Sequence, residues 1–340
     1  MRSLDARRAE AISESLAAAT TMMLEGPAPE TQEYKAGIGT LYDALKAASN
    51  EDAVSDYSDP IRTDKGVAVS PFRAGVCLLD FERTAVFSRG AVQATREQVA
   101  RSANGSANIL YAGSGPFGSL VLPLTKRFSP DEIKILALDI NPISTENLLR
   151  LIRLLDIEDY FVGVATKNAC TFDPQSFVPD VVISETMCRA LISEPYCSIA
   201  KHMVQFLGED GLLLPEEVKV SLSALVVNEG PNDRKTSKRI SLGDVVVFNR
   251  EYLANRENED EMFFNVTFEI PPELYESDYV WFSLDTEVKV FGDNILKHSS
   301  SDITLPIRLG MVEKVDRKFK FVSVKYKPGC DWNDVEMHVF

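Results

Sequence analysis

The feature that most constrains the fold is an apolar strand leading into a glycine turn, followed by a second apolar strand that ends in an acid. The first strand and its turn span residues 108–118, and the second strand and its acid lie within residues 135–142. Gly113 and Gly115 let the backbone approach a ligand closely, because no Cβ stands in the way. Asp139 falls at the second strand end, where a carboxylate can accept both hydroxyls of a ribose. The pattern predicts the first half of a doubly wound, nucleotide-binding domain.

The residues after the second glycine bear on which ligand this turn accepts. A dinucleotide site favours a third small residue there, so that the helix N-terminus meets the pyrophosphate. Pro116 and Phe117 occupy this stretch, and we expect the Phe117 ring to obstruct a pyrophosphate. S-adenosyl-L-methionine (SAM) carries no phosphate, so we predict a SAM site. The predicted cofactor-binding residues of this segment are Gly113, Ser114, Gly115, Asp139, Ile140 and Asn141. Asn141 either touches the ribose or starts the helix at Pro142.

Patterning divides the chain into an N-terminal helical cap (residues 1–100), a Rossmann-like SAM-binding domain (101–215) and a C-terminal β domain (216–340). In the cap, helical periodicity predicts helices over 4–23, 34–48 and about 72–100. In the second region, strands are expected at 109–112, 135–139, 160–165, 181–184 and 212–214, and helices at 144–155 and 196–207. After Pro215 the segments are β-branched and aromatic, and they predict strands at 218–227, 245–249, 262–270, 279–291, 303–309 and 319–326.

Composition excludes several classes of function. The formal charge of −15 argues against nucleic acid, whose phosphates would repel such a surface. The five cysteines are odd in number and show no metal-like spacing, so we expect free thiols, no metal site and a cytoplasmic location. The charged N-terminus has no apolar stretch typical of a signal peptide, and no apolar run is long enough for a membrane span.

Three segments resemble the class I SAM-dependent methyltransferase superfamily and, in their order along the chain, the protein arginine methyltransferases. Residues 80–84 are similar to the Asp-x-x-Arg-Thr motif that precedes the glycine turn in those enzymes, and residues 211–215 to their Gly-x-x-x-Pro entry into the β domain. By this resemblance Arg83 holds the SAM carboxylate, a task that suits a forked guanidinium. The resemblance implies an α/β fold: a Rossmann-like class I methyltransferase core with an N-terminal helical segment and a C-terminal antiparallel β domain.

The third segment carries two glutamates, Glu185 and Glu194, nine positions apart after the fourth predicted strand. The arginine methyltransferases have two glutamates at this spacing, which clamp the cationic acceptor, so the resemblance implies that both are catalytic. Asn168 follows the third strand, where class I enzymes place a side chain on the adenine amino group; a turn asparagine is the alternative. Tyr34, Tyr42 and Tyr57 would cover the sulfonium if the cap helices form a lid, and otherwise they pack in the core.

The chain also departs from the arginine methyltransferases. Tyr111 replaces the usual acid before the first glycine, Phe117 replaces the third glycine, and neither the tyrosine-rich N-terminal signature nor the Thr-His-Trp loop is evident. The Gly-Ser-Gly-Pro and Asp-Ile-Asn-Pro motifs, which end at Pro116 and Pro142, resemble those of nicotianamine synthases. Those enzymes use the aminobutyrate arm of SAM. Azetidine-2-carboxylate synthases, which close the same arm into a ring, share that chemistry.

Three functions therefore stay open at this point. The first is a SAM-dependent transferase that N-methylates a small nitrogen-containing metabolite and releases S-adenosylhomocysteine. The second is a SAM-consuming cyclase or aminobutyrate transferase that releases methylthioadenosine. The third is a SAM-fold scaffold whose β domain binds a partner. We expect a small-molecule substrate, no nucleic acid or membrane partner, and a homodimer as one assembly compatible with the sequence.

Overall fold

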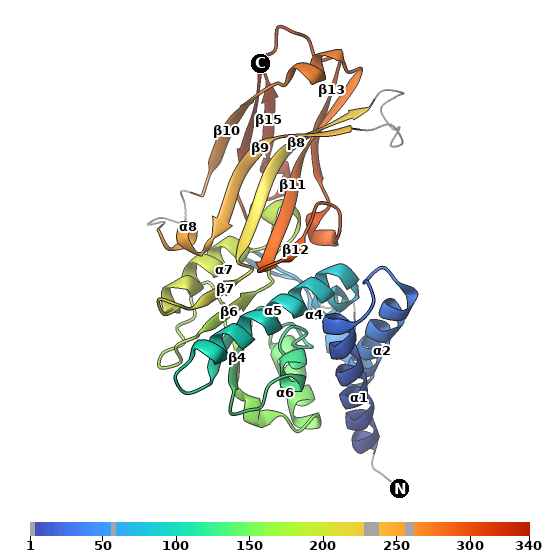
Figure 1. The fold of residues 1–340 in the computed structure, drawn as a ribbon, viewed down its shortest axis with the longest axis vertical. Coiled ribbons are helices and arrows are strands. Elements are labelled where there is room, and N and C mark those ends of the chain that lie inside the picture. The colour runs from blue at the N-terminus through green and yellow to red at the C-terminus, as the bar shows by residue number, and fades with distance from the viewer. Residues whose placement is uncertain (1–3, 56–58, 228–237, 256–261) are drawn as a thin grey trace.

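The computed structural model describes residues 4–55, 59–227, 238–255 and 262–340. Figure 1 shows an elongated molecule with the β domain at one end and the parallel sheet with its helices at the other. The first cap helix and the C-terminus lie at opposite ends of this long axis. We use the three regions predicted from the sequence as names for the parts of the chain.

The cap begins with two long helices, α1 (Leu4–Glu25) and α2 (Gln32–Ala48), which match the first two predicted helices. The third predicted helix is divided into α4 (Pro71–Val76) and α5 (Phe81–Arg101). The division falls at Asp80, whose carboxylate accepts the Arg83 N–H at 3.3 Å and so caps the start of α5. A short helix α3 (Glu51–Val54) and a hairpin of β1 (Ile61–Thr63) and β2 (Gly66–Ala68) precede α4 and were not predicted.

A five-stranded parallel sheet forms the centre of the nucleotide-binding domain, in the order β5-β4-β3-β6-β7. Its strands are β3 (Ala107–Ala112), β4 (Ile133–Asp139), β5 (Phe161–Thr166), β6 (Val181–Ser184) and β7 (Leu212–Leu214). Helix α5 packs against β3, β6 and β7, α6 (Pro142–Leu154) against β4 and β5, and α7 (Tyr196–Met203) against β6. Strand order reverses between β3 and β6, and such a reversal opens a ligand crevice at the carboxyl ends of the strands.

The β domain consists of antiparallel strands. One sheet contains β8 (Glu217–Val227), β9 (Lys238–Asn249), β11 (Tyr279–Phe291), β12 (Asn294–Leu296) and β13 (Ile307–Glu313). A second contains β10 (Phe264–Glu269), β14 (Phe321–Tyr326) and β15 (Glu336–Val339), and α8 (Arg250–Ala254) follows β9. Alternate residues of β8, from Val218 to Leu222, are buried, which explains the period of two read from the sequence. The predicted α/β fold with its appended antiparallel β domain is confirmed; β12, β15 and α8 were missed.

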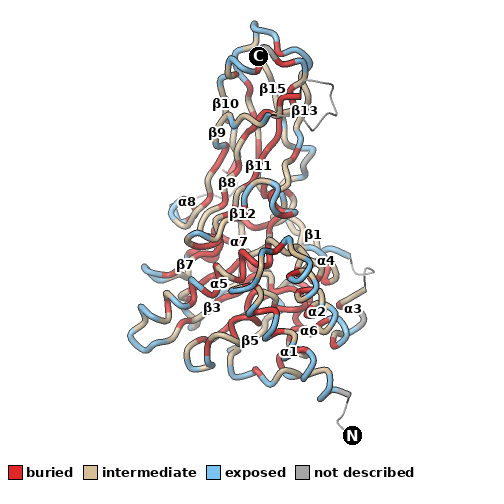
Figure 2. The backbone as a smooth tube through the Cα atoms, turned by 45° about the vertical axis from the view of Figure 1, so that its right-hand side comes forward, coloured by how far each residue is buried: buried red, intermediate tan, exposed pale blue. Residues whose placement is uncertain are grey.

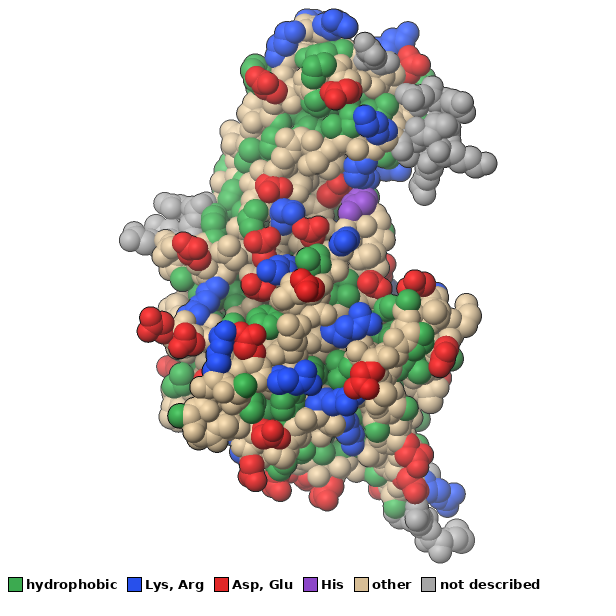
Figure 3. Space-filling model, in the orientation of Figure 1, with side chains coloured by type: hydrophobic (Ala, Val, Ile, Leu, Met, Phe, Trp, Pro, Cys, Tyr) green, Lys and Arg blue, Asp and Glu red, His purple; other side chains and the backbone are tan. Residues whose placement is uncertain are grey.

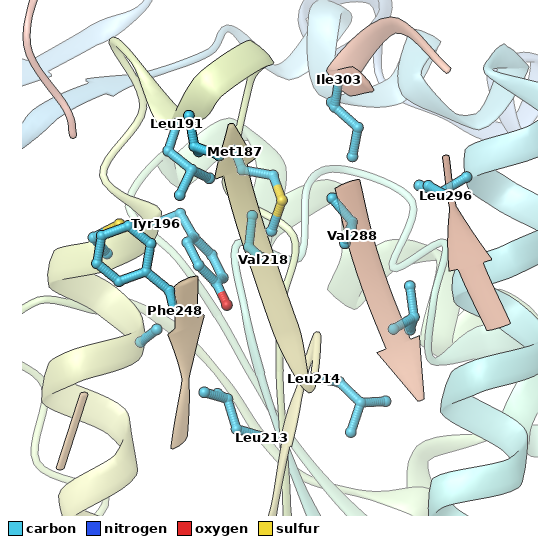
Figure 4. Close-up of a cluster of buried hydrophobic side chains, with 14 of the residues drawn as sticks. Met187, Leu191, Tyr196, Leu213, Leu214, Val218, Phe248, Val288, Leu296 and Ile303 are labelled. Carbon is cyan, nitrogen blue, oxygen red and sulfur yellow. The ribbon is translucent and has the colours of Figure 1, made fainter. Parts of the chain in front are cut away.

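An apolar core runs without interruption from the nucleotide-binding domain into the β domain. Figure 4 shows side chains from both regions converging on this junction, and Figure 2 shows buried backbone continuing through it. The labelled residues are Met187, Leu191, Tyr196, Leu213, Leu214, Val218, Phe248, Val288, Leu296 and Ile303, all buried. Each such apolar side chain contributes about 1.5–3 kcal/mol when buried, so the two regions are held as one packed body.

Acidic and basic side chains are interspersed over the face seen in Figure 3. Among the described residues, no helix combines the length and apolar character needed to cross a membrane.

Candidate functional site

A cavity of about 410 Å³ opens at the carboxyl ends of the parallel strands. Its wall includes residues that directly follow each of four strands: Gly113 after β3, Ile140 after β4, Lys167 after β5 and Glu185 after β6. The cap closes the other side with α4 and with Thr63 and Ala68 of the β1–β2 hairpin. The cavity therefore occupies the crevice at which open α/β sheets bind ligands.

The structure brings nearly all of the predicted site residues to this cavity. Those in its wall are Arg83, Gly113, Ser114, Gly115, Asp139, Ile140, Asn168, Glu185 and Glu194. Asn141 is not among the lining residues. Its side-chain oxygen accepts the Ile143 N–H at 3.0 Å and caps α6. Of the two roles open for Asn141, the structure shows the helix start. The roles of the other residues toward a ligand stay predictions.

The glycine turn is tied to the end of the neighbouring strand. The N–H groups of Gly113 and Ser114 donate to the Leu138 carbonyl at 2.9 and 2.8 Å. Gly113 has a φ of +79°, and a Cβ there would collide with the Thr186 side chain. Only glycine meets both conditions, so this position lets the turn pass close to the loop that follows β6.

Asp139 links the glycine turn to the start of α6. Its Oδ2 accepts the Gly115 N–H at 2.8 Å and its Oδ1 accepts the Asn141 N–H at 2.8 Å. Burial raises the pKa of Asp139, and these two hydrogen bonds oppose that rise. Each carboxylate oxygen has a second lone pair, so the group can still accept ligand hydroxyls from the cavity.

Phe117 does not obstruct the cavity, so the steric argument drawn from the sequence is wrong. Its ring is 2% exposed and is not among the lining residues. It packs edge-on against Tyr42, with ring centroids 6.0 Å apart, and a Cβ on Gly75 would lie 2.9 Å from its Cε2. Phe117 therefore joins the cap to the glycine turn, beneath α4, instead of facing a ligand.

The tyrosines considered as a lid are packing residues where the structure describes them. Tyr34 is fully buried against Phe81, with ring centroids 6.4 Å apart, and Tyr42 contacts Phe117. Neither is among the cavity-lining residues, and Tyr57 lies outside the described residues.

Asn168 holds a turn as well as lining the cavity. Its Oδ1 accepts the Cys170 N–H at 2.9 Å, which is the local turn geometry expected of an asparagine. The carbonyl oxygen that was predicted to meet the adenine amino group therefore already has one backbone partner.

Arg83 and Glu185 form an ion pair across the cavity wall, which the sequence did not predict. Arg83 lies in the first turn of α5, and its Nε contacts Glu185 Oε1 at the end of β6. Only 9% and 10% of the two side chains are exposed. A buried pair of this kind is stabilising only while both partners are present, so each residue holds the other in place.

Asp80 connects the start of α5 to the β domain, a role that the sequence analysis missed. While one carboxylate oxygen caps α5, the other accepts the Ser301 hydroxyl at 2.6 Å and the Asp302 N–H at 2.9 Å. Both Asp80 and Asp302 line the cavity. The β domain thereby fixes the helix start that carries Arg83. The Asp of the Asp-x-x-Arg-Thr motif was the available signal, because aspartate favours the N-cap position.

The loop from Glu185 to Glu194 adopts an unusual backbone. Three of its non-glycine residues have positive φ: Ala190 at 49°, Leu191 at 54° and Ser193 at 64°. Each such conformation costs on the order of 1–3 kcal/mol and persists only where the surroundings impose it. The second glutamate is thus placed by a strained loop and not by a regular helix.

Contacts from both ends of the chain impose this conformation. Ser193 O accepts the Val67 N–H of the β1–β2 hairpin at 2.7 Å. From the β domain come the Cys330 carbonyl, which accepts the Ser193 N–H at 2.8 Å, the Gly329 N–H, which donates to Leu191 O at 2.8 Å, and the Thr286 hydroxyl, which accepts the Ala190 N–H at 2.8 Å. Cap and β domain together determine where Glu194 lies.

Glu194 differs from Glu185 in its electrostatic surroundings. Desolvation raises the pKa of Glu194 to about 7, and the Arg83 charge opposes this rise. No ion pair to Glu194 occurs among the residues the structure describes, whereas Glu185 is paired with Arg83. Near neutral pH the Glu194 carboxyl can therefore take up or release a proton, which suits a general base.

Comparisons with known proteins establish the fold. No protein-family model matches the chain. No curated protein matches it either. Among solved structures, it is similar to the Trypanosoma brucei PRMT1 enzyme–prozyme heterotetrameric complex with AdoHcy, with a TM-score of 0.52 and 13% identity over 77% of this chain and 91% of that chain. The chain therefore shares the fold of that PRMT1 chain. A crystal structure of PRMT6 with SAH gives a TM-score of 0.48 and 12% identity over 74% of this chain and 96% of that chain.

Proposed function

We propose that this chain is a SAM-dependent methyltransferase that transfers the methyl group to a nitrogen of a small metabolite. The observation that carries the proposal is the position of Asp139, which receives the glycine-turn N–H and lies in the wall of the same cavity as Arg83 and Glu194. In this arrangement the Asp139 carboxylate would accept the ribose hydroxyls and the Arg83 guanidinium would bind the amino-acid carboxylate. The similar PRMT1 complex holds AdoHcy, the demethylated product of SAM, which supports this choice of cosubstrate.

The acceptor would bind at the end of the cavity that contains Glu194. In the transfer step the nitrogen lone pair attacks the methyl carbon, the carbon–sulfur bond breaks, and the sulfur keeps the electron pair as S-adenosylhomocysteine forms. The nitrogen must lie about 3 Å from the methyl carbon and in line with the breaking bond. Its proton passes to ionised Glu194, whose raised pKa matches this task near neutral pH.

Glu185 takes a different part in this proposal from the one implied by resemblance. Because it is paired with Arg83, it orients the guanidinium that binds the cosubstrate. Of the two glutamates, only Glu194 is then left to receive the acceptor, and a single carboxylate suits one amine or imidazole nitrogen. This division supports a small nitrogen compound as the acceptor.

The prolines that resemble nicotianamine synthases have structural roles here. The Pro116 carbonyl accepts a hydrogen bond from Asn147 Nδ2 at 2.8 Å, and Pro142 is the first residue of α6. Neither is among the cavity-lining residues, so neither favours attack on the aminobutyrate arm. We therefore propose methyl transfer. The cytoplasmic location and the homodimer stay predictions.

The proposal is tested with methyl-labelled SAM and pools of small amines, guanidines and imidazoles, in parallel with a pool of arginine-containing peptides. We expect label on one or more small compounds, detected by mass, and loss of that transfer in Glu194→Gln. Label on the peptides alone would refute the small-metabolite acceptor. No label in any pool would refute methyl transfer.

A further inference from the structure

Tyr111 is a buried polar side chain of the cavity wall that has no part in the function proposed above. It belongs to the central strand β3, two residues before Gly113, and is 2% exposed. Its register partners on β4 and β6 are Ala137 and Ile183, which offer no polar side-chain atom. A hydrogen-bond partner for its hydroxyl must therefore come from outside the sheet.

Tyr111 shares the cavity wall with Arg83 and the glycine turn. Ser119 offers it a side-chain hydrogen-bond partner, and Arg83 and Asp139 are among its charged neighbours. All of these residues line the cavity. Burial raises the pKa of Tyr111 well above its ordinary value, so the O–H stays intact as a donor at neutral pH.

The Tyr111 hydroxyl matters because the charges around Arg83 are already balanced. The Arg83 guanidinium is already compensated by Glu185, so the pair has no net charge for an incoming carboxylate. A carboxylate bound here requires further donors, and Tyr111 and Ser119 supply two O–H groups without adding charge. An acidic side chain at position 111 would repel a carboxylate, whereas a phenol can donate to it.

We propose that the Tyr111 hydroxyl donates a hydrogen bond to the carboxylate at the amino-acid end of SAM, beside the Arg83 guanidinium. This inference rests on the proposed use of SAM and adds a residue that determines specificity for the aminobutyrate arm. The site would then distinguish SAM and S-adenosylhomocysteine from adenosine derivatives that have no carboxylate.

Calorimetric titration of the full chain with two ligands tests the proposal. S-adenosylhomocysteine carries the carboxylate, and methylthioadenosine has the same nucleoside without it. A hydrogen bond to a charged group is strong enough that we expect Tyr111→Phe to weaken S-adenosylhomocysteine binding about 10- to 100-fold. Methylthioadenosine binding should be unchanged, because that ligand lacks the carboxylate to which the phenol is proposed to donate.

Tyr160→Phe is the matched control, since it removes a tyrosine hydroxyl that bonds to the Thr125 and Phe128 carbonyls outside the cavity. It should change neither affinity. If Tyr111→Phe does not fold, Ser119→Ala carries the test, with a smaller but equally selective loss of S-adenosylhomocysteine binding. Equal weakening of both ligands, or no weakening of either, would overturn the role of Tyr111. A wild type that binds neither ligand would instead refute the proposed function.

Discussion

The buried ion pair between Arg83 and Glu185 makes a quantitative prediction about stability. Replacing Arg83 by methionine keeps most of its volume but leaves the Glu185 carboxylate buried without a counter-charge. Replacing Glu185 by glutamine likewise leaves the Arg83 guanidinium buried without a counter-charge. The double substitution removes both charges, so it should be less damaging than either single change.

The burial of both side chains sets the size of the effect. With only 9% and 10% of the side chains exposed, solvent screens the pair weakly, and breaking such a pair costs about 3–5 kcal/mol. For a chain of this size, 1 kcal/mol lowers Tm by about 2 °C. Each single variant should therefore melt about 6–10 °C below the wild type, and the double variant should recover at least half of that loss.

Thermal unfolding of the wild type, the two single variants and the double variant is the assay. The Lys219–Glu287 pair, at 2.7 Å with 30% and 39% of the side chains exposed, serves as the control. Its single variants should shift Tm by no more than about 2 °C, because exposed pairs contribute about 1 kcal/mol or less. If the losses from Arg83→Met and Glu185→Gln simply add in the double variant, the two residues do not act as a buried pair.

Three further predictions concern the site. Glu194 has a pKa raised to about 7 from its ordinary value, so its contribution to stability is present below its unfolded pKa and is lost as pH rises through 7. The Tm of the wild type minus that of Glu194→Gln should therefore decrease by a few degrees between pH 5 and pH 8, and a constant difference would refute the raised pKa. Asp139→Ala should weaken SAM binding by about 2 kcal/mol or more in calorimetry, and an unchanged affinity would remove Asp139 from the ribose. Gly66→Ala places a Cβ 2.6 Å from Ser193 O, so methyl transfer should fall at least tenfold while S-adenosylhomocysteine affinity stays within about twofold. Gly105→Ala, also at positive φ but with no atom within 4 Å of the added Cβ, is the control that should leave transfer unchanged.

The parts of the fold that were predictable are those specified by local pattern. The glycine turn at Gly113, the apolar run that ends at Asp139, and the period-two alternation of β8 all depend on residues close together in the chain. The same holds for α1 and α2, whose apolar faces repeat at helical spacing. These elements appear where the sequence predicts them, with bounds that differ by a few residues.

Features that depend on distant contacts were not predictable from the sequence. The contact of the Asp80 carboxylate with Ser301 and Asp302 of the β domain is one such feature, because no local pattern shows it. From the sequence, Phe117 was expected to obstruct the ligand site. The direction of its side chain is set by α4, which packs over it, and no local pattern shows that packing.

The candidate site shows the same limit. Spacing and resemblance selected Glu185 and Glu194, and both line the cavity, but their difference arises from the fold. Only the three-dimensional arrangement places Arg83 against one glutamate and leaves the other desolvated and without an ion pair among the described residues. The separate parts proposed for the two glutamates therefore rest on the structure.

The identity of the nucleoside product tests the central claim most directly. The full chain is incubated with SAM, with and without the pool of small nitrogen compounds, and the nucleoside is identified by mass. Our account predicts S-adenosylhomocysteine, formed only when an acceptor is present. Methylthioadenosine formed from SAM alone would contradict it, because that product requires attack on the aminobutyrate arm and not on the methyl group.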